Sequence, residues 1–111
     1  MSPLSLLSLR PESIAELPFQ DLRAGVEIHV LHEAPDGARA AILRYAPGAE
    51  VPAHRHEGFE YIYVLAGEQG DERGTYATGS FVINEPGTVH RVRSELGCTV
   101  LIFLLRPVVF V

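Results

Sequence analysis

The chain has 111 residues, of which 47% are apolar, so it is long enough for one domain with an ordinary core and too short for two. Its net charge is −5, it contains no Lys, and its Arg residues are scattered. We therefore expect neither a nucleic-acid-binding surface nor a membrane-binding surface, because both require clustered positive charge.

The sequence shows neither a signal peptide nor a membrane-spanning segment, and this bears on the expected cellular compartment. The apolar stretch 3–9 has no preceding positive charge and no cleavage pattern, so it makes a poor signal peptide. No run approaches the roughly 18–20 apolar residues that span a bilayer. The single cysteine, Cys98, excludes an internal disulfide and begins an apolar strand, where we expect a small buried side chain. A cytoplasmic location is the expectation.

Residues 1–24 are expected to form an N-terminal arm, and residues 25–111 a single domain. In the arm, Ser13 and Glu16 have the spacing of a capping box that would open a helical turn before Pro18. An extended arm is equally compatible with the sequence. No function is assigned to this segment.

From Val26 onward, short runs rich in β-branched residues alternate with Gly and Pro turn signals. Strands are expected at 26–32 and 39–45, in the segment 48–67, and at 75–78, 81–84, 90–93 and 98–105. Gly67 is expected to close the first hairpin. Short strands at this spacing, with no long helical period, predict an all-β fold, namely an antiparallel barrel or jelly roll.

The segment 48–67 carries the residues most suggestive of chemistry. His54 and His56 are two apart, so in one strand their imidazoles lie on the same face, and Glu60 follows with the same parity. A third histidine, His90, follows a Pro-Gly turn in a later hairpin. Two His from one strand and a third from another suit a metal site between paired strands, with Glu60 completing the ligand set.

These segments resemble the two motifs of the cupin superfamily. The first matches G-(x)5-H-x-H-(x)3-E-(x)6-G at Gly48, His54, His56, Glu60 and Gly67. The second resembles G-(x)5-P-x-G-(x)2-H-(x)3-N at Gly79, Gly87 and His90, but it has Glu85 in place of Pro and Ser94 in place of Asn. These departures affect the turn rather than the ligand positions. The resemblance implies a double-sheet cupin barrel with His54, His56, Glu60 and His90 as metal ligands.

Over about residues 25–105 the chain is also similar to the cupin domain of ChrR-type anti-sigma factors and their stand-alone relatives. The similarity rests on V-E-I-H-V-L-H, A-P-G-A, V-L-A-G-E, G-T-Y-A-T-G-S-F-V and S-E-L-G-C-T-V-L-I. It implies a module that responds to a ligand or an oxidant through its metal. The 24 leading residues contain no Cys for the separate zinc-holding domain of such factors, so direct sigma-factor binding is not expected.

Three imidazoles and one carboxylate suit a divalent transition metal, namely iron, manganese, cobalt, nickel or zinc. An octahedral metal would keep two positions for water, dioxygen or a small-molecule ligand, whereas tetrahedral zinc would be closed. The hypotheses are therefore a metal-dependent dioxygenase of a small ketone or diketone, a sensing module, or a metal-stabilised barrel. The expected lumen residues, Ile62, Val64, Phe81 or Val82, and Val92, favour a largely uncharged ligand. A sugar-phosphate isomerase is less favoured, because it would need Arg or Lys there.

The other polar residues have plainer interpretations. His29 and His32 are expected to be ordinary strand and turn residues, and Glu57 to face solvent. Glu85 has the alternative role of orienting His90.

Strand parity predicts an apolar outer surface. It places Tyr61, Tyr63 and Leu65 outside the barrel, beside the segment 100–105, which is apolar on both faces. We expect a homodimer to cover this surface, with the tail 107–111 joining the contact.

Overall fold

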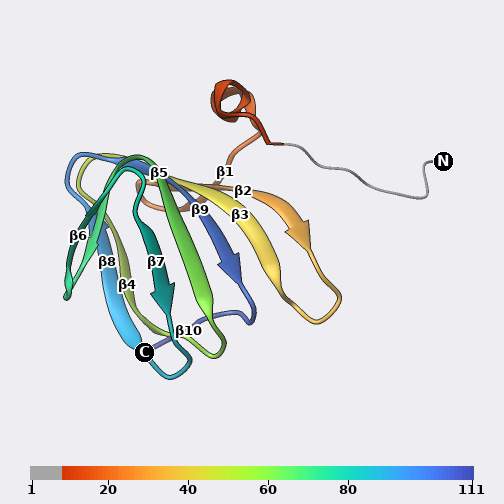
Figure 1. Ribbon diagram of the computed structural model, residues 1–111, viewed down its shortest axis with the longest axis vertical. Coiled ribbons are helices and arrows are strands. Elements are labelled where there is room, and N and C mark those ends of the chain that lie inside the picture. Colours follow the sequence, from red (N-terminus) through yellow and green to blue (C-terminus); the bar gives the residue numbers. More distant parts are fainter. Residues whose placement is uncertain (1–8) are drawn as a thin grey trace.

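The computed structural model describes residues 9–111 and confirms the all-β antiparallel cupin fold (Figure 1). A short 3₁₀ helix, η1 (Pro11–Glu16), precedes ten strands. The strands are β1 (Gln20–Arg23), β2 (Val26–Glu33), β3 (Arg39–Tyr45), β4 (Ala49–Arg55), β5 (Glu60–Asp71), β6 (Gly74–Ala77), β7 (Phe81–Asn84), β8 (Val89–Ser94), β9 (Cys98–Leu104) and β10 (Val109–Phe110).

The end of the N-terminal segment is part of the sheet. η1 covers the expected helical turn, but it begins after Arg10, whose side chain makes no capping hydrogen bond, so the capping box is not formed. β1 then pairs antiparallel with β2, with Gln20 opposite Ile28. No helix within residues 9–111 is long and apolar enough to cross a membrane.

The strands form one curled sheet, a half-barrel whose order is β1-β2-β3-β9-β5-β8-β4-β10, with β6 and β7 also paired to β5. β5 joins the two faces of this sheet. Its first part pairs with β9 and β7, and its last part pairs with β6 and β8. In Figure 1, β6, β8 and β4 lie on one side of β5, and β9, β3 and β2 on the other.

Gly67 lies within β5 and closes no hairpin, which corrects the expectation from sequence. β4 and β5 do not pair with each other, because β4 pairs with β8 and β10. Gly67 has φ +74 and follows a register shift between Val64 and Ala66. A Cβ atom here would overlap the carbonyl oxygen of Gly97, so the bend in β5 brings two backbones into direct contact.

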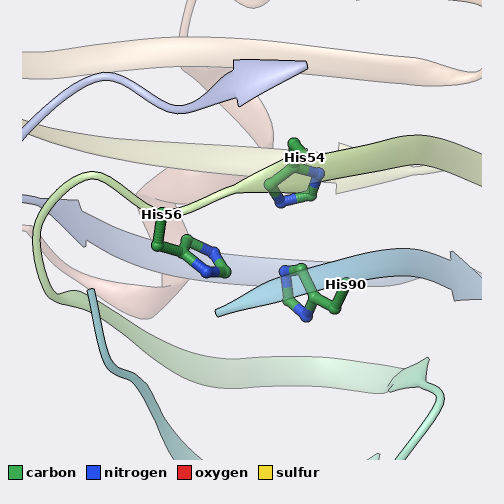
Figure 2. Close-up of side chains that lie close together, drawn as sticks. All are labelled: His54, His56 and His90. Atoms are coloured by element: carbon green, nitrogen blue, oxygen red, sulfur yellow. The ribbon is translucent and has the colours of Figure 1, made fainter. Parts of the chain in front are cut away.

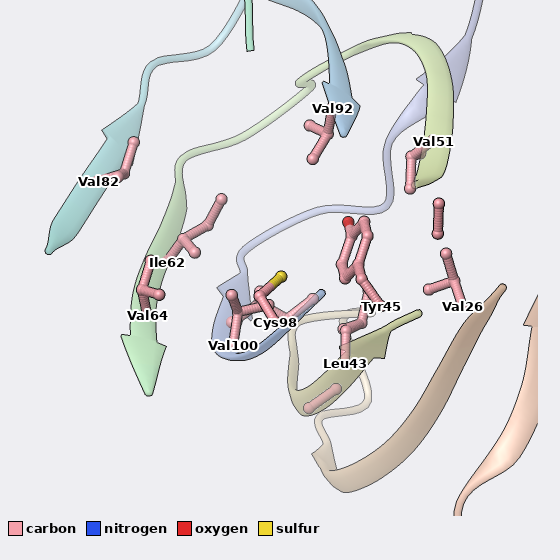
Figure 3. Packing of buried hydrophobic residues seen from close by; sticks show 13 residues of the cluster. Val26, Leu43, Tyr45, Val51, Ile62, Val64, Val82, Val92, Cys98 and Val100 are labelled. Atoms are coloured by element: carbon pink, nitrogen blue, oxygen red, sulfur yellow. The ribbon is translucent and has the colours of Figure 1, made fainter. Parts of the chain in front are cut away.

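The core lies between the two faces of the sheet (Figure 3). Ile62 and Val64 of β5 are buried with Val100 of β9, and Val51 of β4 and Val92 of β8 close the core from the other side. On the outer face, Tyr63 is 40% exposed, so the parity predicted for β5 is confirmed.

We predict that Gly67→Ala destabilises the protein much more than Gly79→Ala. Both glycines have positive φ, which costs an L-residue about 1–2 kcal/mol. Only at Gly67 does the new methyl group also meet backbone, which adds about 1–3 kcal/mol of overpacking, whereas the Cβ of Gly79→Ala would meet nothing within 4 Å. Urea unfolding of the two variants measures the difference, and equal losses would contradict this account of the bend.

Candidate metal centre

Three histidines, two from neighbouring strands and one from the loop that follows β4, meet at one point of the half-barrel. His54 lies in β4 directly opposite His90 in β8, where the two strands pair. His56 follows the last residue of β4, so the prediction that His54 and His56 share one strand is wrong for His56. The backbone N–H of His56 donates to the carbonyl of Thr88 (2.9 Å), and the N–H of Gly87 donates to the carbonyl of His56 (2.7 Å). The turn of the second motif thus positions the second histidine of the first.

The three imidazoles face one another in the interior (Figure 2). Their ring centroids are 5.2 Å apart for His54 and His56, 4.6 Å for His54 and His90, and 4.7 Å for His56 and His90. One nitrogen from each ring lies within 4.8 Å of the others, and all three side chains are buried. The three nitrogen atoms thus surround one position, as the ligands of a single ion do.

Each imidazole is held at Nδ1 by an acceptor outside the cluster. His54 Nδ1 lies 2.8 Å from the carbonyl oxygen of Pro52, and His90 Nδ1 lies 3.0 Å from Oδ2 of Asp71. His56 Nδ1 lies 3.0 Å from Oγ1 of Thr88, whose hydroxyl proton is donated to the carbonyl of Glu85. These acceptors require the proton on Nδ1, so the lone pair of each ring is on Nε2.

The Nε2 atoms of His90 and His56 are not satisfied in the way that buried polar atoms normally are. His90 Nε2 is buried and has no hydrogen-bond partner. His56 Nε2 lies 2.9 Å from Oε1 of Glu60, a contact between two acceptors that needs a proton or a cation to be favourable. Burial lowers the pKa of His54, which favours the neutral, metal-binding form; the carbonyl of Pro52 opposes this effect, and His90 adds to it.

Glu60, the first residue of β5, lies beside the cluster. Its Oε1 contacts His56 and also accepts a hydrogen bond from Nδ2 of Asn84 (3.0 Å). It is not a member of the set of mutually close ligand atoms, which comprises the three histidines. Its role as a fourth metal ligand therefore stays a prediction.

Asp71, at the far end of β5, is a site residue that the sequence analysis missed. Its buried carboxylate binds His90 Nδ1 and receives hydrogen bonds from Nη2 of Arg73 (2.7 Å) and from the hydroxyl of Tyr76 (2.9 Å). Burial raises the pKa of Asp71, but these hydrogen bonds outweigh it and hold the pKa well below its usual value. Arg73 also donates to Oδ1 of Asn84, so one chain of hydrogen bonds joins Glu60 to His90.

The alternative role suggested for Glu85 is wrong, because Asp71 occupies the position it would have taken beside His90. Glu85 is exposed, and its backbone carbonyl contributes to the turn. Asp71 lies 19 residues before His90, so no local sequence pattern could have identified it as the partner of His90.

A cavity of about 250 Å³ adjoins the cluster, and His54 and Glu60 form part of its wall. The remaining wall is mainly apolar and comes from β1, β2, the turn between β2 and β3, β3, β4, β9 and the C-terminal segment: Leu22, Arg23, Ile28, Gly37, Arg39, Leu43, Val51, Ile102, Leu104, Pro107, Val108 and Phe110. β1 and the C-terminal segment thus both contribute to the cavity wall.

The lining predicted from sequence is therefore wrong. Ile62, Val64, Val82 and Val92 are packed in the core, and Phe81 is 59% exposed. The expectation that no Arg faces the cavity is also wrong, because Arg23 and Arg39 line it.

Residues expected to have no role at the site lie outside the cluster. His29 Nδ1 lies 3.2 Å from the carbonyl of Pro18, and His32 is exposed. Cys98 is buried, and burial raises the pKa of its thiol to about 11, so it stays protonated at neutral pH.

The chain is similar to cupins in sequence and structure. The family model for the ChrR cupin-like domain matches residues 12–107. By sequence, the chain matches none of the curated proteins.

Among solved structures, the complex of Rhodobacter sphaeroides SigE with the anti-sigma ChrR aligns with 28% identity and a TM-score of 0.75, covering 82% of this chain and 51% of the matched chain. A cupin-like protein of unknown function from Ralstonia eutropha aligns with 21% identity and a TM-score of 0.67, covering 73% and 55%. The chain thus spans about half the length of these two.

An acetylacetone dioxygenase from Acinetobacter johnsonii shares the fold over the whole of this chain. The TM-score is 0.82, and the alignment covers 80% of the dioxygenase. Identity is 15%, so this likeness concerns the fold alone.

We predict that in metal-free protein at pH 7 His54 and His90 each carry a proton on Nδ1 and present an unprotonated Nε2. Long-range ¹H–¹⁵N correlation spectra of the imidazoles distinguish the two tautomers. In Asp71→Asn the signal of His90 alone should change, because a charge-assisted hydrogen bond worth about 1.5–3 kcal/mol is lost. Tyr76→Phe keeps the carboxylate and is the matched control. A proton on Nε2 of His90 in the unaltered protein would contradict the argument.

Proposed function

Because the chain belongs to the family of ChrR cupin-like domains, we propose that it binds one divalent transition metal through His54, His56, His90 and Glu60 and receives a small organic molecule beside it. The observation that carries this proposal is the convergence of three buried imidazoles held at Nδ1, with one Nε2 atom left without a partner. Such an arrangement has an energetic cost unless a cation occupies it, because buried polar atoms are otherwise paired.

The metal would supply Lewis-acid or oxygen chemistry, according to its identity. The chain's own residues prepare the site. Asp71, Thr88 and the carbonyl of Pro52 hold the rings in the ligating tautomer, and Asn84 orients the carboxylate of Glu60. The adjoining cavity gives the centre a mainly apolar wall on the side of His54 and Glu60.

If the protein is an enzyme, the activity we propose is that of a metal-dependent dioxygenase of a small ketone or diketone. Iron in an octahedral site would leave two adjacent positions for dioxygen and substrate, and the cavity beside His54 is of metabolite size. The fold shared with the acetylacetone dioxygenase is compatible with this form and does not select it. A sugar-phosphate isomerase is less favoured, because one of the two Arg at the cavity is already paired, Arg39 with Glu33.

A second candidate is a regulatory module that senses a ligand or an oxidant through its metal. It is favoured by the match to a chain of the SigE–ChrR complex and by the family match. A sigma factor therefore stays among the candidate partners, contrary to the expectation from the first 24 residues. If the site is found to hold tetrahedral zinc with no open coordination position, the metal has a purely structural role.

Elemental analysis tests the metal centre directly. We expect about one transition-metal ion per chain, and at least a tenfold lower content in His90→Ala, because one of the proposed ligands is lost. His32→Ala removes an exposed histidine outside the cluster and should retain full content. Full occupancy in the double variant with His90→Ala and Glu60→Ala would refute the site. The metal found, with its coordination number, separates catalytic from structural roles.

We also propose that the chain forms a homodimer through the outer face of β5, β7 and β9. Phe59, Tyr61 and Phe81 stack along this face with centroids 6.0 and 6.1 Å apart, and Tyr63 and Phe103 are about 40% exposed beside them. An aromatic patch of this kind is typical of an interface. The tail was expected to join this contact, but it is bound to its own chain, where β10 pairs with β4.

Light scattering after gel filtration should give twice the chain mass at micromolar concentration. Phe81→Arg should give a monomer, because it places a charge in the middle of the aromatic patch. Leu96→Arg alters an exposed apolar residue in the turn before β9 and should leave the mass unchanged. A monomeric unaltered protein would contradict the dimer.

A further inference from the structure

Arg23 is the cation of the cavity wall that has no anionic partner. Six of the nine Arg side chains pair with a carboxylate in the part of the chain that the structure describes, and Arg23 is not among them. Its Nε atom is buried and has no hydrogen-bond partner within residues 9–111. A buried guanidinium nitrogen without a partner is unfavourable, so an acceptor supplied by a ligand would stabilise it.

The charges around the cavity leave Arg23 uncompensated. Four charged or titratable side chains line the cavity: Arg23, Arg39, His54 and Glu60. Arg39 forms an ion pair with Glu33 (3.0 Å), and Glu60 is bound by Asn84 and His56. Glu60 Oε1 thus turns to the histidine cluster and not to Arg23, so within residues 9–111 Arg23 forms no ion pair with another residue of this wall. An unpaired guanidinium beside a mainly apolar space favours a ligand with a negative group.

Arg23 and His54 flank the same aromatic ring. The guanidinium carbon of Arg23 lies 4.7 Å from the ring centroid of Phe110, and that centroid lies 5.7 Å from the ring of His54. β10 fixes this arrangement, because Phe110 is paired with His54 in the sheet. The guanidinium of Arg23 and the histidine cluster are thus one side chain apart on the wall of one cavity.

The size of the cavity limits what it can hold. Its volume of about 250 Å³ equals that of about eight water molecules at about 30 Å³ each. A molecule of about that many non-hydrogen atoms would fill it. Leu43, Val51 and Ile102 provide the apolar contacts.

We propose that this cavity takes a small organic monocarboxylate, whose carboxylate binds the guanidinium of Arg23 and whose short apolar body extends toward His54. This inference names the ligand class for the proposed function and rests on that function only for the metal at the far end of the cavity. The planar fork of Arg is suited to two parallel hydrogen bonds with a carboxylate. The assignment replaces the uncharged ligand expected from sequence, because that expectation depended on a lining that the structure does not have.

Two probes of the same shape test the proposal. The purified protein is titrated calorimetrically with 4-methylpentanoate and with its neutral analogue 4-methylpentanamide. We expect the carboxylate to bind at least tenfold more tightly than the amide. Arg23→Met should remove this preference, because its side chain has similar length and no charge. Arg93→Met removes an exposed Arg paired with Glu95 and should keep the preference. If Arg23→Met does not fold, as judged by thermal unfolding, Arg23→Gln serves instead.

Three outcomes would overturn the assignment. The first is equal affinity of the unaltered protein for the two probes. The second is a preference lost in Arg39→Met and retained in Arg23→Met, which would make Arg39 the anion-binding residue. The third is a preference that disappears on chelation of the metal and survives Arg23→Met, which would place the carboxylate on the metal.

The test also separates this inference from the proposed function. If the purified protein holds no metal but the preference depends on Arg23, the metal centre is refuted and the carboxylate site stands. If the protein is metal-loaded but shows no preference, the metal centre stands and the carboxylate site is refuted.

Discussion

The hydrogen bond at Nδ1 of each histidine is the interaction on which the rest of the site depends. A free imidazole can present either nitrogen, but an acceptor at Nδ1 leaves only Nε2 available. The three acceptors differ in kind: a carbonyl within β4, a hydroxyl in the turn before β8 and a carboxylate at the end of β5. Each belongs to a different part of the fold, so the ligating geometry exists only when the half-barrel has formed.

β5 links these parts. It begins with Glu60 on one side of the cluster and ends with Asp71 on another, and its bend at Gly67 carries the chain between the two faces of the sheet. A side chain at Gly67 would push β5 away from Gly97. The close packing of the backbone at Gly67 against that at Gly97 therefore sets the distance between the carboxylates of Glu60 and Asp71.

The sequence predicted the strands and the inward parity of Ile62 and Val64 from local spacing. It predicted the meeting of His54 and His56 with His90 from the resemblance of two separate segments to the cupin motifs. It failed where a long-range contact decided the outcome. Asp71 was missed because its partner lies 19 residues away, and the cavity lining was missed because the short strands β1 and β10 carry no strong local pattern. Pairing of these strands brings in Arg23 and Phe110, which no periodicity could place beside His54.

The attachment of the C-terminal segment has a practical consequence for handling the protein. The N–H of Val111 donates to the carbonyl of Ala53, the residue that precedes His54. Any residues appended after Val111 would emerge at the rim of the cavity. A polyhistidine purification handle placed there would bring foreign imidazoles close to the cluster, where they could capture or exchange its ion. An amino-terminal or cleavable handle avoids this artefact.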